Sequence, residues 1–299
     1  MKKLFLIVVP ILLISGCTML NIFGNSNVKE MPPDVISLGN FSVLPSGSIR
    51  AGDEFTIYFE VMNLDENDNV NVDYEIYDTG LCEFEGGHIG NDDSSNESGS
   101  LEAFSPQEIR LAEWTFQTPS SRLMAGLDVT CPIRFKFRFS YRATSQVDLV
   151  VVNNSYFSEL QRSGKITSYT PNINIGRGPV KVYFDFGATF PVKANALLPV
   201  YITVENKGTG LLDRIDQGAL TITFPFDVSG ASCPYLTCGG NTCSNSNTYI
   251  PLISKKTLEI RCGGITAPGD ANPEKTYIIS STLDYNYDAD GQVNVEVRP

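Results

Sequence analysis

Residues 134–142 read RFKFRFSYR, and this stretch decides the fold. Aromatic side chains alternate along it with polar ones, which are cationic except for Ser140. Successive side chains of a β-strand point to opposite faces, so four aromatic rings share one face and the cations share the other. This alternation is typical of an antiparallel strand with one face in a core and one face in water.

The same period-two alternation recurs on both sides of this stretch. Residues 55–61 and 70–76 show it clearly, and the polar residues 63–69 between them are expected to form a turn. Further strands are predicted at residues 35–44, 109–116, 147–152, 180–186, 198–205, 219–226, 257–261, 276–285 and 292–297. Helical periodicity is limited to about one turn at 158–162. Short strands separated by turn signals predict an all-β protein of the sandwich type.

The two halves of the chain look like diverged copies. FTIYFEVMN (residues 55–63) parallels LPVYITVEN (residues 198–206), and Tyr141-x-Ala143 parallels Tyr287-x-Ala289. A repeat of this length indicates a pair of domains and not a solenoid.

A family resemblance follows from the lead-in Ala51-Gly52-Asp53, the strand that ends at Asn63, and the second copy at residues 204–208. These residues resemble CARDB-type and related Ig-like modules of prokaryotic (bacterial or archaeal) surface proteins. The resemblance implies sandwiches used for adhesion, spacing or assembly, with no catalytic set. An antibody-type domain fits less well, because Trp114 follows Cys82 too distantly.

The expected organisation is two tandem Ig-like antiparallel β-sandwich domains after a signal peptide and a tether. The signal with its lipobox covers residues 1–17 and the tether 18–34. The domains cover 35–153 and 179–299, joined by a linker at 154–178.

The first seventeen residues, MKKLFLIVVPILLISGC, have two lysines, an apolar run and small residues before a cysteine. This order is that of a secretory signal. Its end, residues 14–17, resembles the lipobox of prokaryotic lipoproteins, which implies a lipidated Cys17. The chain is then extracytoplasmic and anchored to the cell membrane by this lipid. An uncleaved anchor over residues 4–23 and plain secretion are the alternatives.

The seven cysteines divide into Cys17 and an even number in each half. Even numbers in an exported chain predict disulfides within each half. The candidate disulfide residues are Cys82, Cys131, Cys233, Cys238, Cys243 and Cys262. Cys82 pairs with Cys131 if the halves fold separately, and three pairings stay open for the last four. A zinc site at the last four is the alternative, although their spacing matches no common zinc motif.

Enzyme chemistry finds little support. The single histidine, His88, lies in a segment rich in Gly, Asn, Asp and Ser that is expected to be a loop. Nucleophile elbow, phosphate-binding glycine loop and HExxH motifs do not occur. We therefore expect no enzyme, no catalytic residues and no cofactor, although paired carboxylates for glycoside hydrolysis stay open. The formal net charge of −12 argues against nucleic acid as a partner.

Residues 286–291, NYDADG, match the start of a calcium loop, which makes Asn286, Asp288 and Asp290 weak metal candidates. Val297 would occupy position twelve and cannot donate a carboxylate. Asp290-Gly291 between two alternating segments is also a hairpin signal, and we favour that interpretation, with no resident metal.

The cations Arg134, Lys136 and Arg138 form a candidate ligand face for an acidic glycan or protein. A cross-strand charge ladder with Asp73 and Glu75 is the favoured alternative. Asn40, Asn96 and Asn153 begin sequons and are candidate glycosylation sites in a host that glycosylates exported proteins.

The predicted function is that of a membrane-anchored extracytoplasmic lipoprotein with a non-catalytic structural or protein-interaction role at the cell envelope. The alternative is a glycan- or calcium-binding surface module that uses the long loops 79–104 and 229–251. Expected partners are the membrane, through the lipid anchor, and a protein or glycan of the envelope.

Overall fold

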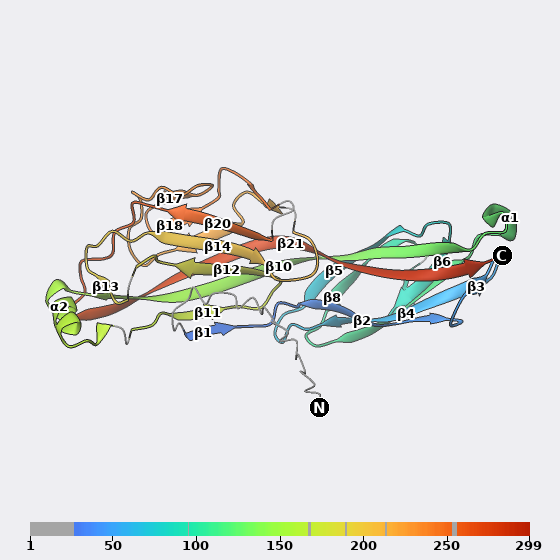
Figure 1. The fold of residues 1–299 in the computed structure, drawn as a ribbon, viewed down its shortest axis with the longest axis horizontal. Coiled ribbons are helices and arrows are strands. Elements are labelled where there is room, and N and C mark those ends of the chain that lie inside the picture. The colour runs from blue at the N-terminus through green and yellow to red at the C-terminus, as the bar shows by residue number, and fades with distance from the viewer. Residues whose placement is uncertain (1–26, 95, 167–168, 189, 213, 253–255) are drawn as a thin grey trace, which may run out of the picture.

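The computed structural model describes residues 27–299, except 95, 167–168, 189, 213 and 253–255. The predicted signal, its Cys17 and the first part of the tether lie outside the described residues. The molecule is elongated, with two lobes on either side of a narrow waist (Figure 1). Strand makes up about 58% and helix about 5%, so the predicted all-β class is confirmed.

The elements have the following bounds. They are β1 (Asn27–Glu30), β2 (Ile36–Leu44), β3 (Ile49–Arg50), β4 (Glu54–Asn63), β5 (Val70–Asp78), β6 (Glu83–Ile89), β7 (Asp92–Ser94), β8 (Ser98–Phe104), β9 (Ile109–Gln117), α1 (Ser121–Met124), β10 (Val129–Val152), α2 (Asn154–Arg162), β11 (Asn172–Ile175), β12 (Val180–Asp185), β13 (Val192–Lys193), β14 (Val200–Asn206), β15 (Arg214–Ile215), β16 (Leu220–Thr223), β17 (Thr237–Gly239), β18 (Thr242–Ser244), β19 (Ile250–Pro251), β20 (Thr257–Cys262) and β21 (Glu274–Arg298).

The first lobe is a sandwich with an aromatic core. Its outer sheet has the order β2-β4-β9-β6-β7, and its inner layer belongs to a larger sheet that contains β8, β5, β10 and β21. Phe59, Trp114 and Phe135 meet between the layers with ring centroids 4.8–5.0 Å apart, and all three are fully buried. Burial of one such ring contributes about 1.5–3 kcal/mol, so the alternating pattern of β10 directly holds the two layers together.

The second lobe repeats this plan with a smaller outer sheet. Strands β12, β14 and β20 form that sheet and face the larger sheet, whose order here is β1-β11-β10-β21-β16-β18-β17. The core combines aliphatic residues such as Val182, Ile202 and Leu149 with the buried rings of Phe184 and Phe224.

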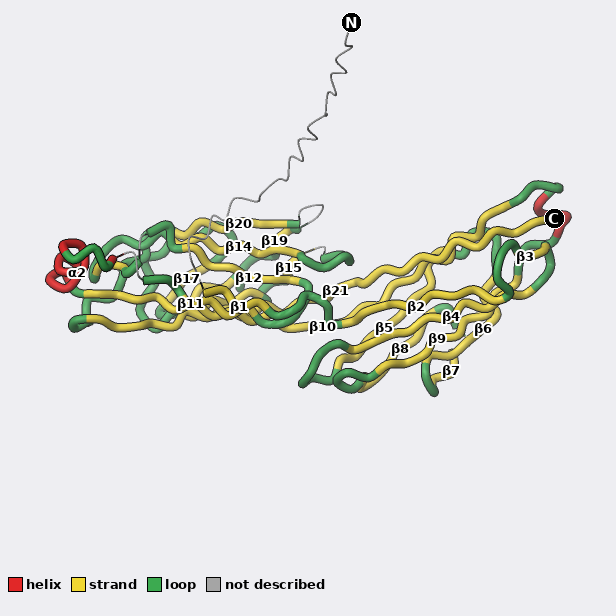
Figure 2. Tube along the Cα trace, turned by 60° about the horizontal axis from the view of Figure 1, so that its bottom comes forward, coloured by secondary structure: helices red, strands yellow, loops and turns green. Residues whose placement is uncertain are grey.

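Strands β10 and β21 belong to both lobes (Figure 2). They pair antiparallel in unbroken register from Val129 opposite Val297 to Val152 opposite Glu274. The first half of β10 pairs with β5 of the first lobe, and its second half pairs with β11 of the second lobe. Strand β21 runs the opposite way, so each lobe contains strands from both halves of the sequence. Independent folding of the predicted domains, residues 35–153 and 179–299, stays a prediction.

The hairpin predicted at Asp290-Gly291 is wrong. Both residues lie inside β21, which merges the two strands expected at 276–285 and 292–297. Packing, and not a turn, explains why residue 291 is a glycine: a Cβ at Gly291 would lie 2.3 Å from Cε2 of Phe135. The ring of Phe135 therefore occupies the space above the Gly291 backbone, an arrangement in which an aromatic ring on one strand covers a glycine on its neighbour.

Other polar segments are also more regular than expected. Residues 27–30 of the predicted tether form β1, which pairs parallel with β11. The expected loop 79–104 contains β6, β7 and β8, and the expected loop 229–251 contains the hairpin β17–β18 and the short strand β19. Polar and glycine-rich composition here accompanies strands near sheet edges, where one face is in water.

Helix α2 extends the single turn predicted at 158–162. Asn153 caps it, because its Oδ1 accepts a hydrogen bond from the Tyr156 amide at 2.8 Å. No helix in the described part of the chain is long and apolar enough to cross a bilayer.

A buried lysine fastens the N-terminal segment to the second lobe. The Lys181 side chain has no exposed surface, and its Nζ donates to the carbonyl oxygens of Met31 and Gly176, each at 2.7 Å. Burial lowers the pKa of Lys181 to about 8.

Candidate functional site

The waist has a local two-fold relationship between the two repeats. Residues 146 positions apart, such as Tyr141 and Tyr287, are equivalent in the repeat, and β10 pairs antiparallel with β21. Consequently Phe137 opposite Ala289 and Ala143 opposite Leu283 are equivalent pairs. The register therefore relates the two strands of the ladder by a rotation about its centre.

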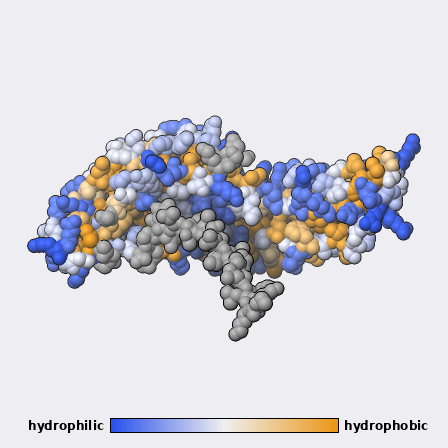
Figure 3. Space-filling view, in the orientation of Figure 1, coloured by the Kyte–Doolittle hydropathy of each residue, from blue (hydrophilic) through white to orange (hydrophobic). Residues whose placement is uncertain are grey.

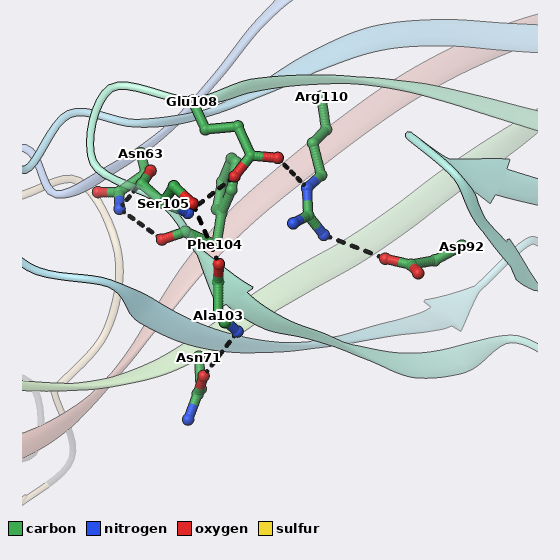
Figure 4. Close-up of polar contacts among 8 residues, drawn as sticks. All are labelled: Asn63, Asn71, Asp92, Ala103, Phe104, Ser105, Glu108 and Arg110. Carbon is green, nitrogen blue, oxygen red and sulfur yellow. Dashed lines mark hydrogen bonds and ion pairs between the residues drawn. The ribbon is translucent and has the colours of Figure 1, made fainter.

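The asparagine that ends the repeated strand motif closes the following turn in both lobes. Asn63 is fully buried, and its Nδ2 donates to the carbonyl oxygens of Phe104 and Ser105 (Figure 4). Its Oδ1 accepts from the Asp65 amide at 2.9 Å. Asn206 does the same with the Gly208 amide at 3.0 Å. The motif that carries the family resemblance is therefore structural.

Equivalent tyrosines of the shared strands hold these turns. The Tyr141 hydroxyl donates to the Asp65 carboxylate, and the Tyr287 hydroxyl donates to Asn206 Oδ1 at 3.1 Å. Burial, followed by the hydrogen bond to Asp65, raises the pKa of Tyr141. Each repeat therefore attaches its own turn to the ladder at the waist.

Near the same turn, Arg110 connects the edge of the outer sheet to the chain that follows β8. Its Nε donates to Glu108 at 2.7 Å and its Nη1 to Asp92 at 3.0 Å (Figure 4). Glu108 also accepts from the Ser105 amide at 2.8 Å, so these polar groups are satisfied within the protein.

The cation row lies on the solvent-facing side of β10 and is paired. Arg138 makes two parallel hydrogen bonds to Asp288, at 2.7 and 2.8 Å, which raise the pKa of its guanidinium. Lys136 is 2.8 Å from Glu75, and Arg134 is 3.2 Å from Asp78.

Arg142 continues the row and was not singled out from sequence. It binds Asp284 through two hydrogen bonds at 2.6 and 3.0 Å. Asp73 stands opposite Arg138 in register, as the ladder hypothesis expected, but its carboxylate accepts from Ser100 at 2.6 Å.

The weak calcium candidates do not form a loop. Asn286, Asp288 and Asp290 lie in the extended strand β21, where Asn286 Oδ1 accepts from Ser140 at 2.6 Å. Both carboxylate oxygens of Asp288 are occupied by Arg138. Burial, with a contribution from Asp288, raises the pKa of Asp290.

A depression, which we call the waist groove, runs over this charged face. Its largest part, about 690 Å³, is lined by Leu211, Arg214, Tyr249 and Pro251 together with Arg138 and Asp288 of the ladder. Smaller hollows that share Arg138 or Asn286 extend it towards each lobe. Tyr249 and Leu211 are each 60% exposed, so the groove combines a charged floor with an apolar rim.

A second surface feature is the end of the first lobe that carries α1 and the C-terminus. Apolar side chains reach the surface at this end (Figure 3). Leu123 and Leu127, in and just after α1, are 72% and 68% exposed. Exposed apolar groups at the tip of an elongated molecule are compatible with contact to another molecule.

His88 lies in β6 and not in a loop. Its Nε2 is 3.8 Å from Glu113 on the neighbouring strand β9. The pair is exposed on the outer face of the first lobe, away from the waist groove.

All six cysteines beyond Cys17 form disulfides. Cys82 bonds Cys131, and the pairings that the sequence left open are Cys233–Cys262 and Cys238–Cys243. The Sγ atoms of Cys233 and Cys238 lie 3.7 Å apart, so the two bridges touch. Sulfurs bonded to each other are not thiolates, so this cluster has no zinc-ligand chemistry in the oxidised state.

The three sequons lie in different settings. Asn40 is in β2 and donates to Glu60 at 2.6 Å, Asn96 lies between β7 and β8, and Asn153 caps α2. Their glycosylation stays a prediction.

Comparisons with known proteins return no family. No family model matches the chain, and no curated protein matches it. Among solved structures it is similar to a transglutaminase of red sea bream, with 11% identity and a TM-score of 0.18 over 87% of this chain. The B domain of a biofilm-associated protein shows 8% identity, a TM-score of 0.19 and coverage of 87% of this chain and 74% of that one. A DUF4466 family protein from Parabacteroides merdae shows 11% identity, a TM-score of 0.17 and coverage of 84% and 99%.

The chain spans 31% of the length of the transglutaminase. TM-scores this low define no shared fold, so the class of this protein follows from its own strand pairing. It is an all-β protein with two packed-sheet lobes that share two long strands.

Proposed function

We propose that the protein is a membrane-anchored extracytoplasmic lipoprotein with a non-catalytic structural or protein-interaction role at the cell envelope. The observation that carries this proposal is the β10–β21 ladder, which runs through both lobes and makes them one elongated body. Such a body suits presentation of a binding surface at a distance from an anchor.

Two further observations support the location. The lysine-rich, apolar and small-residue order that ends at Cys17 resembles a lipobox. Three disulfides in one chain are typical of proteins that fold outside the reducing cytosol. The resemblance to CARDB-type modules supports the same class.

The anchor is tested with Cys17→Ala in cells fed a labelled lipid precursor. We expect the wild-type chain to carry label and to sediment with membranes, and the variant to lose both. Ser15→Ala is the matched control, because it keeps a small residue before the cysteine and should still take label. Label on Cys17→Ala contradicts lipidation.

The waist groove supports a second candidate, a glycan-binding module. Tyr249 offers a ring on which a sugar could stack, and Arg214 and Asn286 offer hydrogen-bonding groups beside it. Pull-down of the full chain from native membranes separates the two proposals. A stoichiometric protein partner supports the structural role, and bound sugar that is lost with Tyr249→Ala supports the glycan module.

The non-catalytic part of the proposal has its own test. Any hydrolytic activity that survives purification and vanishes on substitution of one carboxylate contradicts it. Glu113→Gln is the variant to make first, because Glu113 is the carboxylate next to the single histidine.

A further inference from the structure

The two repeats carry opposite charges at equivalent positions of their shared strands. Arg138 and Arg142 of β10 face Asp288 and Asp284 of β21. With the 146-residue offset that relates the repeats, Arg138 is equivalent to Asp284 and Arg142 to Asp288. One repeat therefore supplies both cations and the other supplies both anions.

Side-chain size is complementary at the same interface. Phe135 of β10 covers Gly291 of β21, whereas the equivalent pair is Ser145 with Ser281, whose hydroxyls are 2.8 Å apart. A large residue thus meets a glycine on one side of the ladder's centre, and two small residues meet on the other side.

Both the charges and the side-chain sizes disfavour pairing of a repeat with a copy of itself. Two copies of β10 in this register would place Arg138 opposite Arg142 twice, and two copies of β21 would place Asp284 opposite Asp288 twice. Like charges directly opposite one another on neighbouring strands are destabilising. Two copies of β10 would also set Phe135 opposite Ser145, whose Cβ fills the space that Gly291 leaves open.

We propose that the facing edges of β10 and β21 form a selective recognition surface through which repeat one pairs only with repeat two. Outside its own chain, the partner that this surface fits is the complementary repeat of a second copy of the protein. This inference goes beyond the proposed function. It requires that no covalent cross-link ties the repeats to each other, and each of the three disulfides lies within one repeat.

The test uses two variants of the full chain in a mild detergent. Arg138→Asp with Arg142→Asp makes both ladder strands acidic, and Asp284→Arg with Asp288→Arg makes both basic. The β10 of each variant is then complementary to the β21 of the other. Each variant is unfolded without reductant, and the two are refolded separately or as an equimolar mixture, with masses measured by native mass spectrometry.

We expect the mixture to contain a heterodimer at a level at least about tenfold above the dimer of either variant alone. The heterodimer should decrease at about 1 M salt, where screening acts over roughly 3 Å. The chain with all four substitutions restores opposite charges within one molecule and should refold as a monomer, like the wild type.

A mixture that yields only folded monomers overturns the proposal, and so do homodimers as abundant as the heterodimer. If the double variants fail to fold, Arg142→Asp and Asp284→Arg are mixed instead. Their side chains are 65% and 53% exposed, so each single change leaves the core intact. Folded monomers alone, or homodimers as abundant as the heterodimer, then overturn the proposal in the same way.

Discussion

Ser140 on β10 faces Asn286 on β21, and its hydroxyl donates to Asn286 Oδ1 at 2.6 Å. These two residues are equivalent in the repeat, and here the repeat offset and the antiparallel register coincide. Every other pair of the ladder, except the terminal pair Val152–Glu274, has an equivalent pair on the opposite side of this one. The local two-fold axis therefore passes through a hydrogen bond between the two repeats.

Cleavage of the connection between the repeats should not separate them. A protease site inserted after Gly164, beyond the end of α2, interrupts the chain without touching the β10–β21 ladder. The cut halves should elute together in native size-exclusion chromatography and part only in denaturant. Separate elution under native conditions would show that the predicted ranges 35–153 and 179–299 fold independently.

Gly291→Ala should lower the free energy of unfolding by about 1–3 kcal/mol, the usual cost of overpacking a core. The new methyl group would overlap the Phe135 ring. Gly39→Ala is the control, because a Cβ at this β2 position meets nothing within 4 Å. Urea unfolding measures both, and equal losses would contradict the packing explanation of Gly291.

The contribution of Lys181 should depend on pH. Its pKa in the folded protein is about 8, and in the unfolded chain it is near the ordinary value of roughly 10.4. Between these values the unfolded chain binds more protons, so stability rises with pH. Relative to that of Lys181→Met, the free energy of unfolding of the wild type should increase by up to about 3 kcal/mol from pH 7 to pH 10.5.

Urea midpoints of both proteins across this range provide the test of Lys181. The difference between them cancels the titration of groups that both proteins share, such as the buried tyrosines. A difference that stays constant with pH would show that Lys181 titrates normally in the fold.

The disulfides should differ in their contribution to stability. Cys82–Cys131 links residues 49 apart, whereas Cys238–Cys243 links residues 5 apart. Loop-closure entropy then predicts a loss of roughly 4 kcal/mol for the double alanine variant of the first pair and roughly 2 kcal/mol for the second. Thermal unfolding of the two variants compares them, and the opposite order would contradict the loop-length argument.

Local patterns predicted most strands because alternation reports which face of a strand is buried. The runs at 55–61 and 134–142 lie in β4 and β10, where the structure buries their apolar face. The hairpin at Asp290-Gly291 failed for a non-local reason. The residue that explains the glycine is Phe135, which is distant in sequence, so a local turn signal could not reveal it.

In the candidate site, too, local patterns did not reveal contacts between residues that are distant in sequence. Asp73 and Glu75 were expected to pair with the cation row. Glu75 does pair with Lys136, but the two-point partner of Arg138 is Asp288, 150 positions away. One sequence signal pointed towards these acids: in the repeat alignment Arg138 is equivalent to Asp284 and Arg142 to Asp288, so the cations of one repeat correspond to anions of the other. The pairing of the last four cysteines depends on the β17–β18 hairpin, which their spacing alone does not specify.

The unbroken register of β10 with β21 has a mechanical consequence. A pull along the long axis of the molecule loads these two strands in shear, so that their hydrogen bonds resist together. Strands peeled apart from one end would instead lose their bonds one after another. The waist, although it is the narrowest part of the molecule, therefore transmits tension and is not a point at which the lobes give way separately.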